Sequence, residues 1–98
     1  MNIIFEIIDK NKKLIRLTDK QHSHMMDEHP YMSRYMEEIK DTLKKPDKIT
    51  SYSFDEGIRY FYKGYKHLDK ANKYLVIIVK YLNGEGFIIS SYLETKIK

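Results

Sequence analysis

The sequence contains no cysteine, which excludes disulfides, thiol nucleophiles and cysteine-based zinc sites together. It has no run of about 18 apolar residues, so we expect no helix that spans a membrane. Its start, MNIIFEII, lacks the basic residues and the small-residue cleavage site of a signal peptide. These three absences predict a cytoplasmic protein without a membrane partner.

Motifs that would identify an enzyme class are also missing. There is no HExxH motif, no serine in a nucleophile elbow and no glycine-rich phosphate loop. Gly84 and Gly86 are expected instead in a hairpin turn, where positive φ is needed. His22 and His29 share a helical face but lie two turns, about 10 Å, apart, and His24 points elsewhere. We therefore expect neither a metal site nor a cofactor.

Length and charge describe what is present. The 98 residues suffice for one domain, spanning residues 1–98, with a single modest core. The net charge is +4, and residues 45–98 carry ten basic and six acidic side chains. That region also holds most of the nine tyrosines. A basic sheet with interleaved tyrosines could bind RNA, although the lysines could equally be ordinary solvent-facing side chains.

The clearest structural signal is the stretch YLVIIVKYLNGEGFIISSYL, residues Tyr74 to Leu93. It predicts two strands joined by a short Asn-Gly-Glu-Gly turn. The apolar run from Leu75 to Val79 is unbroken, so both faces of its strand should be covered. We expect this strand at the centre of a sheet.

The upstream segments provide the remaining elements. An N-terminal β-hairpin is predicted over residues 2–8 and 13–17. A helix is predicted to follow from Thr18 or Asp19 to His29, and a second helix from Pro30 to Leu43. Strands are predicted over residues 48–54 and 58–65, and a polar turn over 67–72. Helices followed by a run of strands indicate an α+β fold. We expect a four-stranded antiparallel sheet with the helices packed on one face.

The polar residues expected on the last strands are of the types that take part in phosphate binding and proton transfer. Strand alternation places Arg59 with Lys63 on one face, and Ser90 with Tyr92 on one face. Together with a helix histidine, these are the side chains that a metal-independent ribonuclease uses. RNA carries its own nucleophile, the 2′-hydroxyl, so the protein needs only proton transfer and stabilisation of the phosphorane charge.

Several motifs resemble the phage-associated branch of the Barnase–EndoU–Colicin–RelE (BECR) nuclease superfamily. They are a histidine-bearing helix, His29-Pro30 followed by Met32, Pro46-Asp47 followed by Ile49, the basic-aromatic segment IRYFYK, and the end NGEGFIISSY. The similarity covers residues 14–98. It implies a RelE-like fold for the four-stranded sheet and its helices, and metal-independent cleavage of mRNA, rRNA or tRNA. It also implies the role of a toxin in a toxin–antitoxin or phage-defence pair, with a cognate antitoxin as partner.

The resemblance assigns roles residue by residue. The helix histidine of the family falls on His24 and its His-Pro histidine on His29, so both are candidates for proton transfer, while His22 replaces a tryptophan and is expected in the core. Tyr31 stands where relatives have an acidic residue.

The terminal Thr-Ala-Tyr of the family is Ser90-Ser91-Tyr92 here, which keeps Ser90 and Tyr92 as substrate-binding candidates. Arg59 and Lys63 are expected to hold phosphate. Two alternatives stay open: a non-catalytic module that binds RNA, and a protein-interaction module without nucleic-acid contact.

Overall fold

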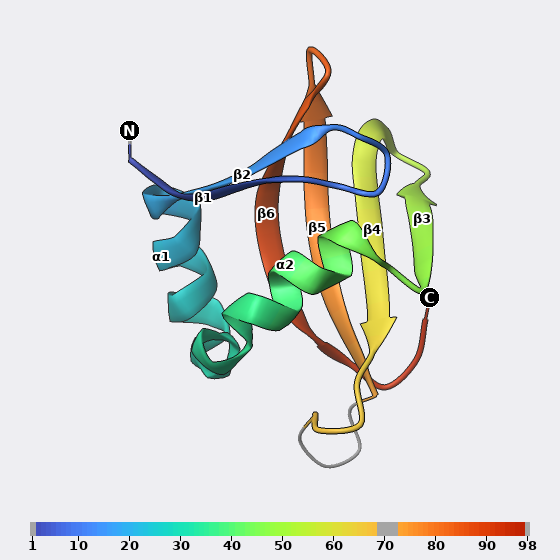
Figure 1. Ribbon diagram of the computed structural model, residues 1–98. Coiled ribbons are helices and arrows are strands. Elements are labelled where there is room, and N and C mark those ends of the chain that lie inside the picture. The colour runs from blue at the N-terminus through green and yellow to red at the C-terminus, as the bar shows by residue number, and fades with distance from the viewer. Residues whose placement is uncertain (1, 69–72, 98) are drawn as a thin grey trace.

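The computed structural model describes residues 2–68 and 73–97. The elements follow the predicted order of two strands, a helical region and four strands (Figure 1). They are β1 (Ile3–Ile8), β2 (Leu14–Thr18), α1 (Asp19–Glu28), the 3₁₀ helix η1 (Pro30–Tyr35), α2 (Met36–Lys44), β3 (Lys48–Tyr52), β4 (Asp55–Gly64), β5 (Tyr74–Leu82) and β6 (Glu85–Glu94). The polar turn predicted over residues 67–72 lies largely outside the described residues.

The sheet differs from the prediction. All six strands belong to one mixed sheet in the order β1-β2-β6-β5-β4-β3, in which β2 and β6 are parallel and every other pair is antiparallel. The expected separate four-stranded antiparallel sheet of RelE type is therefore wrong. The N-terminal hairpin does form, but it extends the sheet from β6 rather than standing apart from it.

The contact between Ile15 and Gly86 explains how the hairpin joins. These two residues are register partners in the parallel pairing of β2 with β6. A Cβ added to Gly86 would collide with the Cδ1 atom of Ile15, whose side chain is fully buried. Glycine at this position therefore lets Ile15 pack directly on β6. Gly86 was expected in the turn, but it pairs with Tyr81 inside the strand, and the turn itself consists of Asn83 and Gly84, both at positive φ.

The helical region contains one correction. Of the two predicted caps, Thr18 rather than Asp19 caps α1, since its Oγ1 accepts a hydrogen bond from the Gln21 amide at 3.3 Å. The single helix expected from Pro30 to Leu43 is two elements, η1 and α2. Tyr35 leaves helical geometry between them (φ −118°, ψ 24°), and its ring, 4 % exposed, packs in the core.

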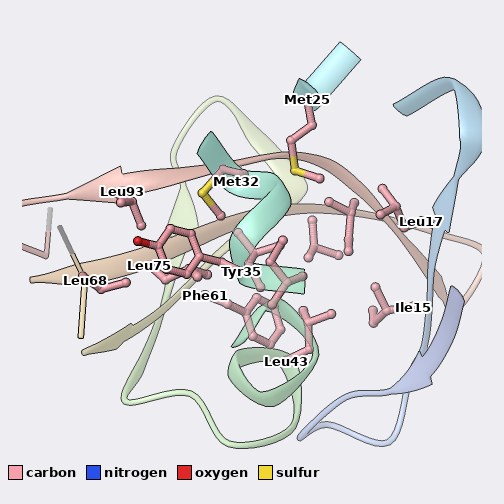
Figure 2. Packing of buried hydrophobic residues seen from close by; sticks show 14 residues of the cluster. Ile15, Leu17, Met25, Met32, Tyr35, Leu43, Phe61, Leu68, Leu75 and Leu93 are labelled. Carbon is pink, nitrogen blue, oxygen red and sulfur yellow. The ribbon is translucent and has the colours of Figure 1, made fainter. Parts of the chain in front are cut away.

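The core lies between the helices and one face of the sheet (Figures 1 and 2). Phe61 and Ile77 are paired neighbours on this helix-covered face, where α2 contributes Ile39 and Leu43. Leu75, Val76, Ile77 and Val79 are all fully buried, which confirms the prediction that both faces of β5 are covered and that it lies inside the sheet.

A β-bulge in β6 sets which side chains face away from the helices. Val79 pairs with Ile88 but Ile78 pairs with Ser90, so Ile89 is the extra residue. Ile88 belongs to the core, whereas Ser90 lies beside Ile78 on the opposite face. The bulge therefore transfers Ser90 and Tyr92 to the face without helices.

Candidate functional site

The face of the sheet opposite the helices carries a group of tyrosines. Tyr60 and Tyr62 on β4 lie here, as the predicted alternation of that strand requires. Tyr62 pairs with Val76, and Val76 pairs with Tyr92 on β6, so the three share this face. Tyr52 of β3 joins them, with its ring centroid 6.3 Å from that of Tyr60. We call the surface defined by Tyr52, Tyr60, Tyr62 and Tyr92 the tyrosine face.

Aromatic rings contact one another in two groups on this face, one on β3 and β4 and one at β6. Tyr60 and Tyr62 are stacked, with centroids 6.5 Å apart and an interplanar angle of 21°. At the β6 end, the ring of His29 lies 5.7 Å from that of Tyr92. At the β3 end, Phe54 contacts Tyr52 edge-on at 5.5 Å. Tyr62 is buried beneath its neighbours, so the rings that a base could stack on are those of Tyr52, Phe54, Tyr60 and Tyr92.

His29 reaches the tyrosine face because of where α1 ends. It is the C-cap residue of α1, and Pro30 begins η1 immediately after it. The Tyr31 hydroxyl lies 3.3 Å from Nδ1 of His29, within hydrogen-bond distance. Among the described residues, nothing bonds to Nε2. The half-buried imidazole is thus held on Nδ1, and its Nε2 is left without a bonding partner among these residues, as a proton-transfer group requires.

Tyr92 is a hydrogen-bond donor at neutral pH. Partial burial, followed by the proximity of Tyr60 and Tyr62, raises the pKa of Tyr92 to about 12. Its hydroxyl therefore stays protonated under physiological conditions. Ser90 lies on the same face, two residues before it, and is half-buried. Ser91 has a structural role instead: it is fully buried and donates to the Val76 carbonyl at 2.8 Å.

The two predicted phosphate-binding side chains lie on the other side of the sheet. Arg59 and Lys63 share a face, as alternation predicts, but it is the face of Phe61, covered by helices. Nη1 of Arg59 donates to the carbonyls of Glu56 (2.5 Å) and Ile58 (2.9 Å). Both side chains are therefore separated from Ser90 and Tyr92 by the sheet itself.

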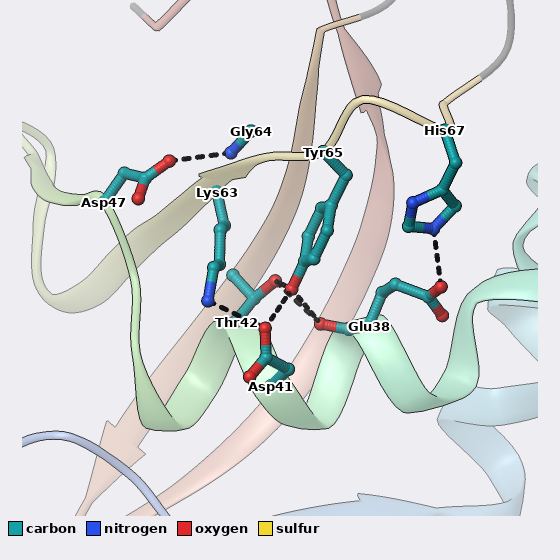
Figure 3. Close-up of polar contacts among 8 residues, drawn as sticks. All are labelled: Glu38, Asp41, Thr42, Asp47, Lys63, Gly64, Tyr65 and His67. Carbon is teal, nitrogen blue, oxygen red and sulfur yellow. Dashed lines mark hydrogen bonds and ion pairs between the residues drawn. The ribbon is translucent and has the colours of Figure 1, made fainter.

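Lys63 belongs to a polar network that attaches α2 to β4 (Figure 3). Its Nζ and the Tyr65 hydroxyl each lie 2.7 Å from Oδ2 of Asp41. The Lys63 bond, followed by that of Tyr65, lowers the pKa of Asp41, while burial and the bond to Asp41 raise the pKa of Tyr65. Nearby, Nε2 of His67 lies 2.7 Å from Oε2 of Glu38. These bonds have a structural purpose, because they join a helix to the sheet it covers.

The remaining histidines do not reach the tyrosine face. His24 is exposed on α1 and lies more than a quarter-turn away from buried Met25. His22 is half-buried on the side of α1 that holds Met25. Over residues 2–68 and 73–97, no three His, Asp or Glu side chains gather where they could hold a metal ion. In the same ranges, no helix is long and apolar enough to cross a bilayer.

Basic side chains border the tyrosine face. Lys48 on β3 is the register partner of Tyr62 and is exposed. Lys80 lies on the same face of β5 but forms an ion pair with Asp55. Arg16 pairs with Glu6 at 2.8 Å and with Glu85 at 2.9 Å. Lys48 is thus the best-placed of these three cations for a phosphate.

The sequence indicated part of this site and missed the rest. It proposed His29, Ser90 and Tyr92, which the structure brings to one face, and it placed Tyr60 and Tyr62 together. It gave no role to Tyr31, which was only noted as a replacement, or to Tyr52 and Phe54. The available signal is the density of aromatic residues in SYSF and IRYFYK, since alternation places Tyr60 and Tyr62 on one face while Phe61 points into the core.

Comparison with models of protein families, with curated proteins and with solved structures found no match to this chain. The function proposed below is therefore argued from the geometry of the tyrosine face alone.

Proposed function

We propose that this chain is a metal-independent endoribonuclease whose substrate lies on the tyrosine face. The observation that carries the proposal is that His29, whose Nε2 forms no bond within the described residues, lies against Tyr92 on the same face of the sheet as the aromatic cluster of Tyr52 and Tyr60. Stacking platforms of this kind bind single-stranded RNA, and histidine is the commonest side chain for proton transfer.

In the proposed reaction, His29 first accepts a proton from the 2′-hydroxyl and then donates it to the leaving 5′ oxygen. Nε2 takes the proton of the 2′-hydroxyl, the 2′ oxygen forms a bond to phosphorus, and the bond from phosphorus to the 5′ oxygen breaks. The imidazolium then returns the proton to the leaving 5′ oxygen. The products are a 2′,3′-cyclic phosphate and a 5′-hydroxyl end, so atoms and charge balance.

Tyr92 and Ser90 are assigned to charge stabilisation. Because its pKa is raised to about 12, Tyr92 is suited to donating a hydrogen bond to a phosphate oxygen rather than to releasing its proton. Ser90 can supply a second hydroxyl from the same face. This assignment replaces Arg59 and Lys63, whose bonds hold them on the helix-covered face.

The test uses purified protein with total RNA in EDTA, over a wide range of protein concentration. Cleavage that persists in EDTA and leaves cyclic phosphate ends is the expected result. Full-length RNA at every protein concentration would reject catalysis.

A second candidate function is RNA binding without cleavage. One observation favours it: Arg59 and Lys63 are bonded on the face opposite His29, so they do not supply cations to a phosphorane there. In that case wild-type protein would bind RNA with an affinity that falls steeply from low to physiological salt, and would leave the RNA intact.

The wider role follows from the resemblance to Barnase–EndoU–Colicin–RelE nucleases. We propose a cytoplasmic toxin whose cognate antitoxin covers the tyrosine face. Co-expression with the product of the adjacent reading frame tests this: relief of growth arrest supports the pairing, and unrelieved arrest opposes it.

A further inference from the structure

A hollow of about 240 Å³ lies at the β3 end of the tyrosine face. Its lining consists of Thr50, Ser51, Tyr52, Tyr60 and Tyr62. Beside it stands Phe54, in the turn between β3 and β4, with its ring edge-on to that of Tyr52. Phe54 is 85 % exposed and Tyr52 is 40 % exposed, whereas Tyr62 beneath them is 2 % exposed. Tyr62 therefore lies buried beneath the hollow, while Tyr52 and Phe54 project from the sheet surface into solvent at its rim.

The side chains that line the hollow suit the base of a nucleotide better than its phosphate. The phenol rings of Tyr52 and Tyr60 offer flat apolar surface, and the hydroxyls of Thr50 and these tyrosines can donate or accept hydrogen bonds, whereas Ser51, the register partner of Arg59, contributes backbone. None of the five lining residues carries a charge, so the hollow is poorly suited to a phosphate. A nucleobase combines a flat ring with a polar edge and carries no charge, which matches the lining.

The base must be unpaired to enter. In a duplex its Watson–Crick edge is already bonded and its faces are stacked on neighbouring bases. The hollow, on β3 and β4, also lies away from His29, whose ring contacts Tyr92 on β6. The base that it accepts is therefore not the one next to the phosphate that is cut.

We infer that the hollow formed by Thr50, Ser51, Tyr52, Tyr60 and Tyr62, with Phe54 at its rim, binds an unpaired base of single-stranded RNA and sets sequence preference away from the cut. The inference rests on the proposed function for its ligand class. It does not require that the protein cleaves RNA, because binding and cleavage can be measured separately.

The experiment is an NMR titration of the full ¹⁵N-labelled chain with a short 2′-O-methyl RNA, which lacks the nucleophilic hydroxyl and cannot be cut. The expected result is a set of shift changes at Thr50 to Phe54 with single-stranded RNA, and none there with the same RNA as a duplex. Shifts confined to the region of His29 and Tyr92 would overturn the base subsite while leaving the proposed function intact. The absence of shift changes with any RNA would overturn both the base subsite and the proposed function. Shift changes at Thr50 to Phe54 that a peptide produces and RNA does not would also overturn both.

Two variants sharpen the test. Phe54→Ala should weaken single-strand binding by about five- to a hundredfold, the usual effect of removing one stacking ring. Tyr52→Phe keeps the ring and removes the hydroxyl, so it should preserve most of the affinity. The control is Leu82→Ala, an equally apolar truncation at a side chain that is 53 % exposed at the end of β5. Equal losses of affinity in Phe54→Ala and Leu82→Ala would overturn the inference.

Discussion

The imidazole of His29 and the phenol of Tyr92 lie with their ring centroids 5.7 Å apart, although one ends a helix and the other belongs to the last strand. Two local features create this proximity. The helix α1 ends where Pro30 begins η1, which leaves His29 at the end of the helix, and the bulge at Ile89 turns Tyr92 to the face without helices. The contact places the imidazole beside a phenol that stays protonated at neutral pH.

The Tyr92 hydroxyl can be tested apart from its ring. Tyr92→Phe should reduce the cleavage rate about a hundredfold, the usual effect of removing one donor to a developing charge. RNA affinity should change little, because the stacking surface remains. Single-turnover rates and equilibrium binding on the same RNA separate the two effects. A large loss of affinity with an unchanged rate would show that Tyr92 serves binding alone.

Lys48 should contribute charge rather than stacking. Lys48→Gln removes an exposed cation from the border of the tyrosine face and should reduce the slope of log affinity against log salt by about 0.7, as expected for one phosphate contact on a single strand. Lys44→Gln, an exposed cation at the end of α2, is the matched control. Equal salt slopes for wild type and Lys48→Gln would contradict this placement of the RNA.

Gly86→Ala tests the packing that joins the hairpin to β6. The new methyl would collide with Ile15 and meet Val79 Cγ1 at 3.0 Å, so we expect a loss of about 1–3 kcal/mol in the free energy of unfolding. Gly64→Ala is the control, since the nearest atom to its Cβ would be at an ordinary 3.4 Å. Urea unfolding of both variants measures the difference. Similar stabilities would show that Ile15 does not depend on the glycine.

The bond between Asp41 and Lys63 predicts a pH-dependent contribution to stability. Because the pKa of Asp41 is lowered in the folded state, the stabilisation is fully present above its ordinary value of 3.8 and is lost as the pH falls through the lowered value. Both side chains are partly exposed, so Lys63→Met should cost about 1 kcal/mol or less at pH 7. Urea unfolding at pH 7 and pH 2 checks this: the difference from wild type should shrink at pH 2. A difference of the same size at both pH values would contradict it.

Local patterns predicted most elements of this fold. The alternation in IRYFYK, a turn at Asn83-Gly84 and a cap at Thr18 or Asp19 each depend on a few neighbouring residues: the alternation is confirmed, Thr18 is the cap, and the turn is two residues shorter than the predicted Asn-Gly-Glu-Gly. The parallel pairing of β2 with β6 was missed because it joins segments distant in sequence. Its one local trace is Gly86, which serves equally well in a turn.

The site was predicted in part for the same reason. Both same-face pairs, Arg59 with Lys63 and Ser90 with Tyr92, are confirmed by the register. Which face Ser90 and Tyr92 occupy depends on the bulge at Ile89, since one extra residue reverses every side chain after it on β6, whereas Arg59 and Lys63 follow regular alternation along β4. Simple alternation along β6 would have put Tyr92 on the side of Ile88, in the core.

The most direct test of the account compares the two faces of the sheet in one assay. Single-turnover cleavage of a defined single-stranded RNA in EDTA would be measured for wild type, His29→Gln, His24→Ala and Lys63→Met, each checked for folding by circular dichroism. We predict that His29→Gln slows cleavage by about 10²- to 10⁴-fold, the usual contribution of a proton-transfer group. His24→Ala and Lys63→Met should leave the rate close to that of wild type. A rate that survives His29→Gln but collapses in Lys63→Met would place the reaction on the helix-covered face and contradict the account.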